Sequence, residues 1–198
     1  MYIPSVYRKF QVRCRTNIDM SLHLQFKPNW CIKFWDNESP ADYHCQTGAL
    51  IVGNPDVGEV HFKGRLTNIS RLPCAENEAR MVGEKLGVEP LLGQQATKLA
   101  VLQAMNSVAL IHIAAHGDAE RGEVSLAPSF PIPNRIPQEE LYLLTMSDIS
   151  KVQLRAKLVV LSCCHSARGL QTKTEGAVGI ARAFLGSGAS SEIGRAHV

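Results

Sequence analysis

Two stretches decide the fold of this chain: ALIHIAAHGD at residues 109–118 and KLVVLSCCHSARG at residues 157–169. Each is a continuous run of apolar residues that ends at a reactive side chain, His116 in the first and Cys164 in the second. Runs rich in β-branched residues and leucine, without polar alternation, are typical of strands buried on both faces of a parallel sheet. Ligands and chemistry collect beyond the carboxyl ends of such strands. If the two strands are neighbours, an imidazole and a thiol meet at one edge of the sheet.

From Gly48 onward the chain alternates predicted strands and predicted helices. The strands are predicted at 49–53, 88–93, 109–115 and 158–164. The helices are predicted at 75–87, 97–107, 146–154 and 174–189, with Thr97 and Thr174 as N-caps of two of them. Alternation of elements of this length predicts the α/β class, with a mainly parallel central sheet. This architecture calls for one more buried strand after the last helix, and no apolar run follows to supply it.

The two ends of the chain read differently from the middle. Residues 1–42 hold both tryptophans and show neither a helical period nor a strand alternation, so we leave them unassigned and outside the predicted domain. Residues 193–198 read IGRAHV, which matches one reading frame of a common sequencing-library adapter. We therefore expect residues 192–198 to be a sequencing-adapter artefact, and exclude His197 from the chemistry.

Composition and charge favour one intracellular domain. The chain has 198 residues and a net charge of +3, and residues 1–40 supply the whole excess with six basic and three acidic side chains. Basic residues do not gather on one element, so nucleic-acid binding is not expected. The six cysteines are too few and too scattered for a disulfide framework. No signal peptide or long apolar span is visible, so we expect a reducing, cytoplasmic location without membrane contact.

A thiol beside an imidazole is a chemically consistent pair for acyl transfer. The thiol pKa is about 8.5, and a neighbouring histidine can hold the thiolate and later deliver a proton to the leaving group. Acyl transfer also needs donors aimed at the developing oxyanion. Gly117 lets the backbone approach a substrate carbonyl closely, so its N–H and that of Cys164 are the candidate donors. No cofactor is needed for this chemistry and none is expected.

Each motif offers alternatives. Cys163 points to the opposite strand face from Cys164 and is expected to pack as a small apolar group. His112 lies within the predicted strand and reads as a satisfied core histidine, whereas His165 is the stronger rival to His116. Adjacent Cys163, Cys164 and His165 lack the spacing of zinc ligands, so no metal is expected. From residue types alone, a structural role for the cysteine and the histidine is favoured over catalysis.

Several stretches together resemble a known family. They are HIAAHGD at 112–118, VVLSCCHSARG at 159–169 and TEGAVGIARAFLGSGA at 174–189. They are similar to the CHAT domain (caspase HetF associated with tetratricopeptide repeats), a relative of caspases and separases. The resemblance covers residues 43–191. It implies a caspase-like three-layer αβα fold, with a mainly parallel central sheet that is truncated at its C-terminal edge.

The resemblance also implies a site. It assigns His116 as general base and Cys164 as nucleophile of a cysteine endopeptidase, with a protein substrate. It further implies a region of helical repeats in the full-length protein, which would present or recruit protein partners. This chain departs from the family pattern at Cys163 and His165, which flank the nucleophile where many relatives have alanine and an acidic residue. As it stands, the chain is expected to be an inactive fragment. The alternative to a peptidase is a catalytically silent peptidase-like module that binds proteins.

Overall fold

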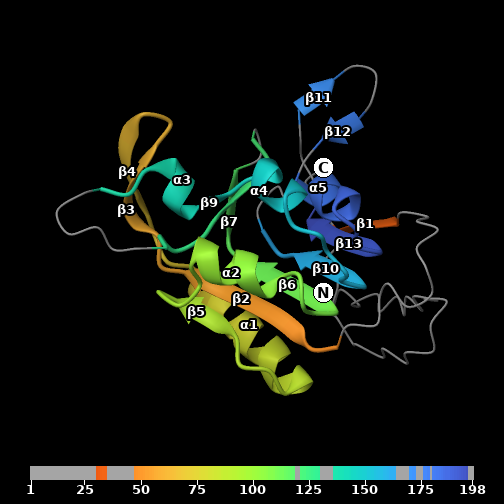
Figure 1. Cartoon of the computed structure of the whole chain (residues 1–198). Coiled ribbons are helices and arrows are strands. Elements are labelled where there is room, and N and C mark those ends of the chain that lie inside the picture. The colour runs from red at the N-terminus through yellow and green to blue at the C-terminus, as the bar shows by residue number, and fades with distance from the viewer. Residues whose placement is uncertain are drawn as a thin grey trace, which may run out of the picture.

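The central sheet of the chain is mainly parallel, as the alternation of elements predicts. The computed structural model describes residues 30–34, 47–118, 121–129, 136–163, 170–172, 176–178 and 180–195. These residues form a six-stranded sheet in the order β1-β13-β10-β6-β2-β5, in which β1 alone runs antiparallel to its neighbour (Figure 1). Its strands are β1 (Trp30–Phe34), β2 (Ala49–Pro55), β5 (Leu91–Gly93), β6 (Leu110–Ala114), β10 (Leu158–Leu161) and β13 (Ser191–Arg195).

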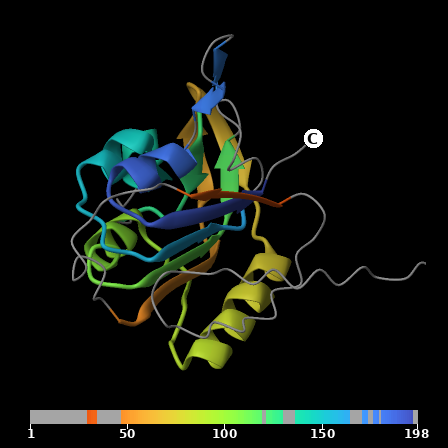
Figure 2. The same cartoon turned by 90° about the vertical axis from the view of Figure 1, so that its right-hand side faces the viewer.

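Helices cover the sheet on both faces, so the fold has three layers. Figure 2 shows α1 (Pro73–Leu86) on one side of the sheet, with three shorter helices on the other. Those helices are α2 (Lys98–Ala104), α4 (Met146–Ser150) and α5 (Ile180–Gly186). The predicted caspase-like αβα architecture is confirmed by this arrangement.

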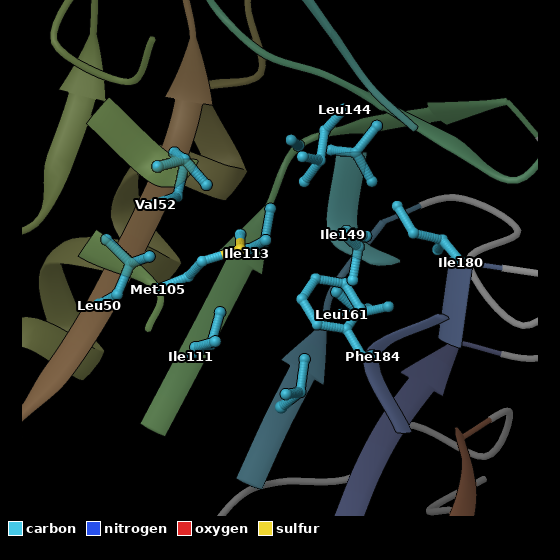
Figure 3. Close-up of a cluster of buried hydrophobic side chains, with 14 of the residues drawn as sticks. Leu50, Val52, Met105, Ile111, Ile113, Leu144, Ile149, Leu161, Ile180 and Phe184 are labelled. Carbon is cyan, nitrogen blue, oxygen red and sulfur yellow. The ribbon is translucent and has the colours of Figure 1, made fainter. Parts of the chain in front are cut away.

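Strand alternation divides the apolar side chains between two cores. Leu50 and Val52 of β2 point into the larger core, whereas Ile51 between them packs under α1 against Ala79. The larger core also takes apolar side chains from β6, β10, α2, α4 and α5, among them Met105, Ile111, Ile113, Ile149, Leu161, Ile180 and Phe184 (Figure 3). The predicted helix ends are also correct in two places: the Thr97 hydroxyl accepts from the Ala100 N–H, and Gly87 ends α1 in the left-handed conformation.

Two small sheets stand at the carboxyl edge of the central sheet, and the sequence analysis did not predict them. The hairpin of β3 (Gly58–Phe62) and β4 (Arg65–Ile69) follows β2 directly. Its two turn residues, Lys63 and Gly64, both have positive φ angles, the requirement of a tight two-residue hairpin turn. The second sheet contains β7 (His116–Asp118), β8 (Glu123–Ser125) and β9 (Leu143–Leu144), with the short helix α3 (Glu139–Tyr142) before β9.

Two expectations near the end of the chain are wrong. The helix predicted over 174–189 begins at Ile180, because Gly176–Val178 forms strand β12 and pairs antiparallel with β11 (Leu170–Thr172). A further strand also follows α5 where none was expected. The sequence of β13, SEIGR, is not an apolar run, so apolar pattern does not predict this strand. Its backbone nevertheless pairs with a strand on each side.

We expect the contact between β2 and α1 to tolerate no side chain at Gly53. A Cβ there would overlap the Cβ of Ala79 and lie 3.0 Å from the Ala75 carbonyl oxygen. Gly53→Ala should therefore lower the free energy of unfolding by about 1–3 kcal/mol, measured by urea denaturation. Gly186→Ala is the control: a Cβ there meets nothing within 4 Å, and alanine should be neutral or slightly stabilising. Equal effects of the two substitutions would contradict the close contact.

Candidate functional site

His116 lies just beyond the carboxyl end of β6, as the sequence predicts. β6 ends at Ala114, the buried Ala115 follows, and His116 opens β7 with a half-buried side chain. Gly117 is the next residue of β7 and stands opposite Val124 of β8. The histidine is therefore held at the edge of the central sheet by β6, which ends two residues before it, and by β7, which it opens.

The neighbouring strand also ends at this edge. β10 is the parallel partner of β6, with Leu161 opposite Ile113. The pairing continues beyond the strand end, because the Ser162 N–H donates to the Ile113 carbonyl at 2.8 Å. Cys163 is fully buried in the larger core and its thiol lies 3.5 Å from the same carbonyl. The expectation that Cys163 packs as a small apolar group is confirmed.

A backbone carbonyl orients the His116 ring. Nε2 of His116 lies 2.8 Å from the carbonyl oxygen of Ser70, which follows β4. A carbonyl oxygen can only accept a hydrogen bond, so Nε2 carries the proton and donates it. In the neutral ring the other nitrogen, Nδ1, then has the lone pair that can accept a proton. Sequence analysis missed Ser70, because a main-chain acceptor 46 residues away leaves no side-chain signature.

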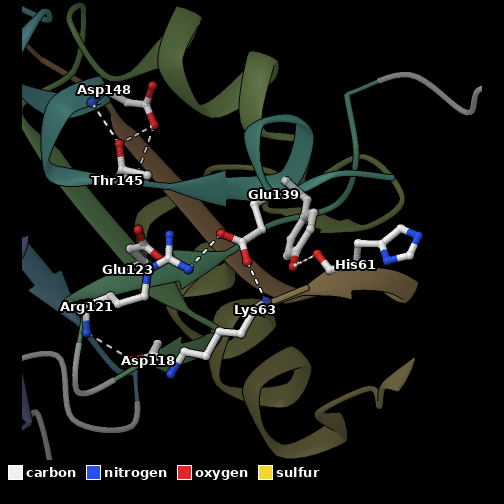
Figure 4. A network of polar contacts seen from close by, with 9 residues as sticks. His61, Lys63, Asp118, Arg121, Glu123, Glu139, Thr145 and Asp148 are labelled. Atoms are coloured by element: carbon white, nitrogen blue, oxygen red, sulfur yellow. Dashed lines mark hydrogen bonds and ion pairs between the residues drawn. The ribbon is translucent and has the colours of Figure 1, made fainter. Parts of the chain in front are cut away.

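Ion pairs and a hydrogen bond tie the β3–β4 hairpin to α3 and to β7, the strand that His116 opens (Figure 4). Lys63 at the β3–β4 turn pairs with Asp118 of β7 at 3.0 Å, and its backbone N–H donates to Glu139 of α3 at 2.6 Å. Arg121, in the β7–β8 connection, pairs with the same Glu139 at 2.7 Å and with Glu123 at 3.0 Å. Through Lys63 and Arg121 these acidic groups connect the β3–β4 turn, the β7–β8 hairpin and α3.

Protonation states in this network follow from burial and from hydrogen bonds. Burial raises the pKa of Glu123, an effect that Arg121 partly offsets. The hydrogen bond from the Lys63 N–H lowers the pKa of Glu139, so this carboxylate stays ionised at neutral pH. Burial raises the pKa of Tyr142 to about 12. Its hydroxyl therefore keeps its proton, which it donates to the His61 carbonyl at 3.0 Å.

A second charged cluster fixes the start of α4. Asp148 and Thr145 form a capping box, and Lys98 of α2 reaches the Asp148 carboxylate at 2.8 Å. Burial alone would raise the pKa of Asp148, but the hydrogen bonds from Lys98 and Thr145 outweigh it and leave the pKa lowered. This cluster joins α2 to the start of α4 and so stabilises the helix layer.

Three candidate residues remain: His112, which lies in the core, and Cys164 and His165, which the structure does not describe. His112 is buried on β6, as expected of a core residue, with Nε2 3.2 Å from a carboxylate oxygen of Glu78 of α1. Nε2 nevertheless has no hydrogen-bond partner among the residues that the structure describes, so the expectation of a satisfied ring is not met. Cys164 and His165 lie outside the described residues, so their distances from His116 and the weighed zinc alternative stay untested. Within the described ranges, no three side chains of the metal-ligating types converge. No helix in the same ranges is long and apolar enough to cross a bilayer.

Comparison with known proteins agrees with the fold described above. Residues 34–195 match the model of the CHAT domain family. The chain therefore belongs to the CHAT domain family, and its domain is of the caspase-like, peptidase-related class.

Its curated relatives carry one name. This chain is 33% identical over 184 residues to tetratricopeptide repeat protein 28 of Mus musculus, and 30% identical over 184 residues to the protein of that name in Homo sapiens. Both matches cover 77% of this chain. The chain spans only 7% of the length of each relative, so the similarity concerns one module of a much longer protein.

Loss of the Glu139 carboxylate should loosen the β3–β4 hairpin. We expect Glu139→Ala to speed amide hydrogen exchange at Lys63 and its neighbours roughly fivefold, as a loss of about 1 kcal/mol of local stability would do. Because the folded-state pKa of Glu139 is lowered, its contribution is complete above its ordinary pKa of about 4.3. It is lost as the pH falls through the lowered value.

The matched control for this measurement is Glu140→Ala. Glu140 is the next residue along α3 and its side chain is exposed. Exchange at Lys63 should be unchanged in this variant at every pH. If both variants loosen the hairpin alike, loss of helix α3 rather than of the Glu139 contact would be the cause.

Proposed function

We propose that the domain is a cysteine endopeptidase of the caspase and separase type, with His116 as general base and Cys164 as nucleophile. The backbone N–H groups of Gly117 and Cys164 are the proposed oxyanion donors. The substrate is a protein, and the chemistry needs neither a metal nor a cofactor. The cysteine content supports a reducing, cytoplasmic location for this thiol.

The orientation of His116 is the observation that carries this proposal. A structural histidine in a sheet is normally buried, as His112 is, with Nε2 3.2 Å from Glu78. His116 is instead half-exposed at the carboxyl edge, and its one described hydrogen bond, to the Ser70 carbonyl, uses Nε2. Nδ1 is thereby kept as the basic nitrogen, which is the state a general base needs.

Strand register supports Cys164 as its partner. Leu161 and Ile113 face each other across the parallel pair β10–β6. Cys164 and His116 each stand three residues further along their own segments. Residues that follow neighbouring parallel strands by the same distance begin from the same level of the edge. Cys163 is excluded as nucleophile because its thiol is buried in the core.

The proposed reaction uses these groups in four steps. The Cys164 thiol gives its proton to Nδ1 of His116, and the thiolate attacks the scissile carbonyl carbon. The carbonyl oxygen becomes an oxyanion, to which the two backbone N–H groups donate. The C–N bond then breaks as the imidazolium protonates the leaving amine. Finally water, deprotonated by His116, attacks the thioester and releases the acid and the free thiol.

A second function is favoured by the relatives. Both are named tetratricopeptide repeat proteins, which supports a region of helical repeats in the protein to which this chain belongs. In that context a silent domain would act as a protein-binding or scaffold module. Cys163 and His165, which depart from the family pattern beside the nucleophile, also favour this alternative.

Alkylation of Cys164 against pH separates the two functions. We expect the thiolate of Cys164 to form well below the ordinary thiol pKa of about 8.5, and its midpoint to rise in His116→Ala, with alkylation at pH 7 falling about tenfold. Mass spectrometry of the peptide that holds Cys163 and Cys164 follows the reaction, and the exposed Cys74 is the internal reference. A Cys164 that is indifferent to His116 would leave the protein-binding module as the function.

Self-cleavage provides the matched test of the nucleophile. If the purified protein cleaves itself, Cys164→Ala should abolish the cleavage and Cys163→Ala should spare it. The control is close, because the two cysteines are adjacent and Cys163 is buried in the core. Cleavage that survives Cys164→Ala would remove Cys164 from the reaction.

A further inference from the structure

The segment that presents the Ser70 carbonyl to His116 is itself held by a residue on the central sheet. Ser70 lies between the end of β4 at Ile69 and the start of α1 at Pro73. Ser70 and Arg71 are exposed, so packing does not fix this short connection. Hydrogen bonds to its backbone therefore contribute to its position.

Asn54 supplies such a bond from the carboxyl end of β2. The residue is 2% exposed and adopts a positive φ of 47°, a strained conformation that asparagine tolerates better than most residues. Its Oδ1 accepts the backbone N–H of Leu72, and its Nδ2 donates to Oε2 of Glu76 at 2.9 Å. The N–H can only donate and the carboxylate can only accept, so the orientation of the Asn54 amide is fixed by its partners.

The Leu72 contact replaces a missing helix cap. Leu72 is the N-cap residue of α1, and its side chain makes no capping hydrogen bond. In a capping box the N–H of this residue would be taken by an acidic side chain three residues later, where this chain has the buried Ala75. Asn54, 18 residues earlier in the sequence, accepts that N–H instead.

Glu76 completes the anchor. Its carboxylate also pairs with Arg71 at 3.1 Å and with Arg80 at 2.9 Å. The hydrogen bond from Asn54 is the main cause that lowers the pKa of Glu76, with the bond from Arg80 next. The carboxylate is therefore ionised at neutral pH, and Asn54 is tied through it to the first turns of α1 and to the residue beside Ser70.

We propose that Asn54 is a positioning residue for His116: it fixes the 70–72 segment so that the Ser70 carbonyl accepts the Nε2 proton and leaves Nδ1 as the base. The inference rests on the proposed function for its consequence, but its structural claim concerns His116 alone. Asn54 touches no reacting atom. It acts through Leu72, which is two residues from Ser70, and through Ser70 on the imidazole.

The test is the tautomer of His116, read from long-range ¹H–¹⁵N spectra of the histidine-labelled protein. The wild-type chain should show the Nε2–H tautomer. Asn54→Gly keeps the left-handed backbone accessible but removes both side-chain bonds, so the ring nitrogen shifts should move toward the average of an unconstrained imidazole. In the same variant, alkylation of Cys164 at pH 7 should fall relative to the wild-type chain, but by less than the fall of about tenfold expected of His116→Ala, since the base remains but is misaligned.

Asn54→Asp is the conservative partner variant. An aspartate keeps the acceptor for the Leu72 N–H and loses the donor to Glu76. It should therefore retain the Nε2–H tautomer, even if repulsion from Glu76 lowers the free energy of unfolding. Urea denaturation of each variant separates stability from positioning.

The possible outcomes are distinct. If Asn54→Gly destabilises the fold but leaves the His116 tautomer as in the wild type, Asn54 is merely structural and the proposal is overturned, while the peptidase proposal is unaffected. If the tautomer changes but Cys164 is indifferent to His116 in the wild-type chain, the positioning claim stands and the peptidase proposal fails. A wild-type ring without the Nε2–H tautomer would overturn the positioning claim directly.

Discussion

The parallel register between β6 and β10 is the constraint on which the rest of the carboxyl edge of the central sheet depends. Ile111 and Ile113 of β6, and Val159 and Leu161 of β10, all point into the larger core. A slip of one residue would turn one strand's apolar side chains to the opposite face. Burial therefore locks the register, and the register sets which residues leave the sheet at the same level. The hydrophobic core in this way determines the geometry of the polar site at its border.

Polar groups hold the β3–β4 hairpin at the carboxyl edge of the central sheet. Its turn is tied to Glu139 and Asp118 through Lys63, and the segment after it is tied to Asn54 through Leu72. Charges with limited solvent access are tolerated only when they are paired and hydrogen-bonded. Here the pairing has a geometric result, because it fixes the hairpin at both ends. The Ser70 carbonyl between these anchors is left with little freedom relative to the His116 ring.

The sequence predicted the parts of the molecule that depend on side-chain pattern. The buried strands, Thr97 as a helix cap, Gly87 as a helix end and the burial of Cys163 follow from periodicity and residue type, and all are confirmed. Parts that depend on the backbone were missed. The hairpin turn at Lys63 and Gly64 has positive φ angles but lacks the usual Asn-Gly signal, and β13 pairs through main-chain bonds without an apolar run.

The candidate site divides along the same line. The meeting of the carboxyl ends of β6 and β10 at one edge was predicted, because the apolar runs before His116 and Cys164 are visible in the sequence. The orientation of His116 was not predicted, since it depends on a carbonyl contributed by a distant loop. Local patterns carry no information on which loop will fold back onto a strand end.

The main-chain nature of the Ser70 acceptor has an evolutionary consequence. Every amino acid at position 70 offers a carbonyl oxygen, so a point mutation there changes the side chain and keeps the acceptor. A comprehensive substitution scan would mark the histidine as sensitive and its hydrogen-bond partner as tolerant. Insertions or deletions between β4 and α1 would be selected against far more strongly than substitutions. Purifying selection on this contact would thus conserve the length of the loop, which a profile of residue identities does not record.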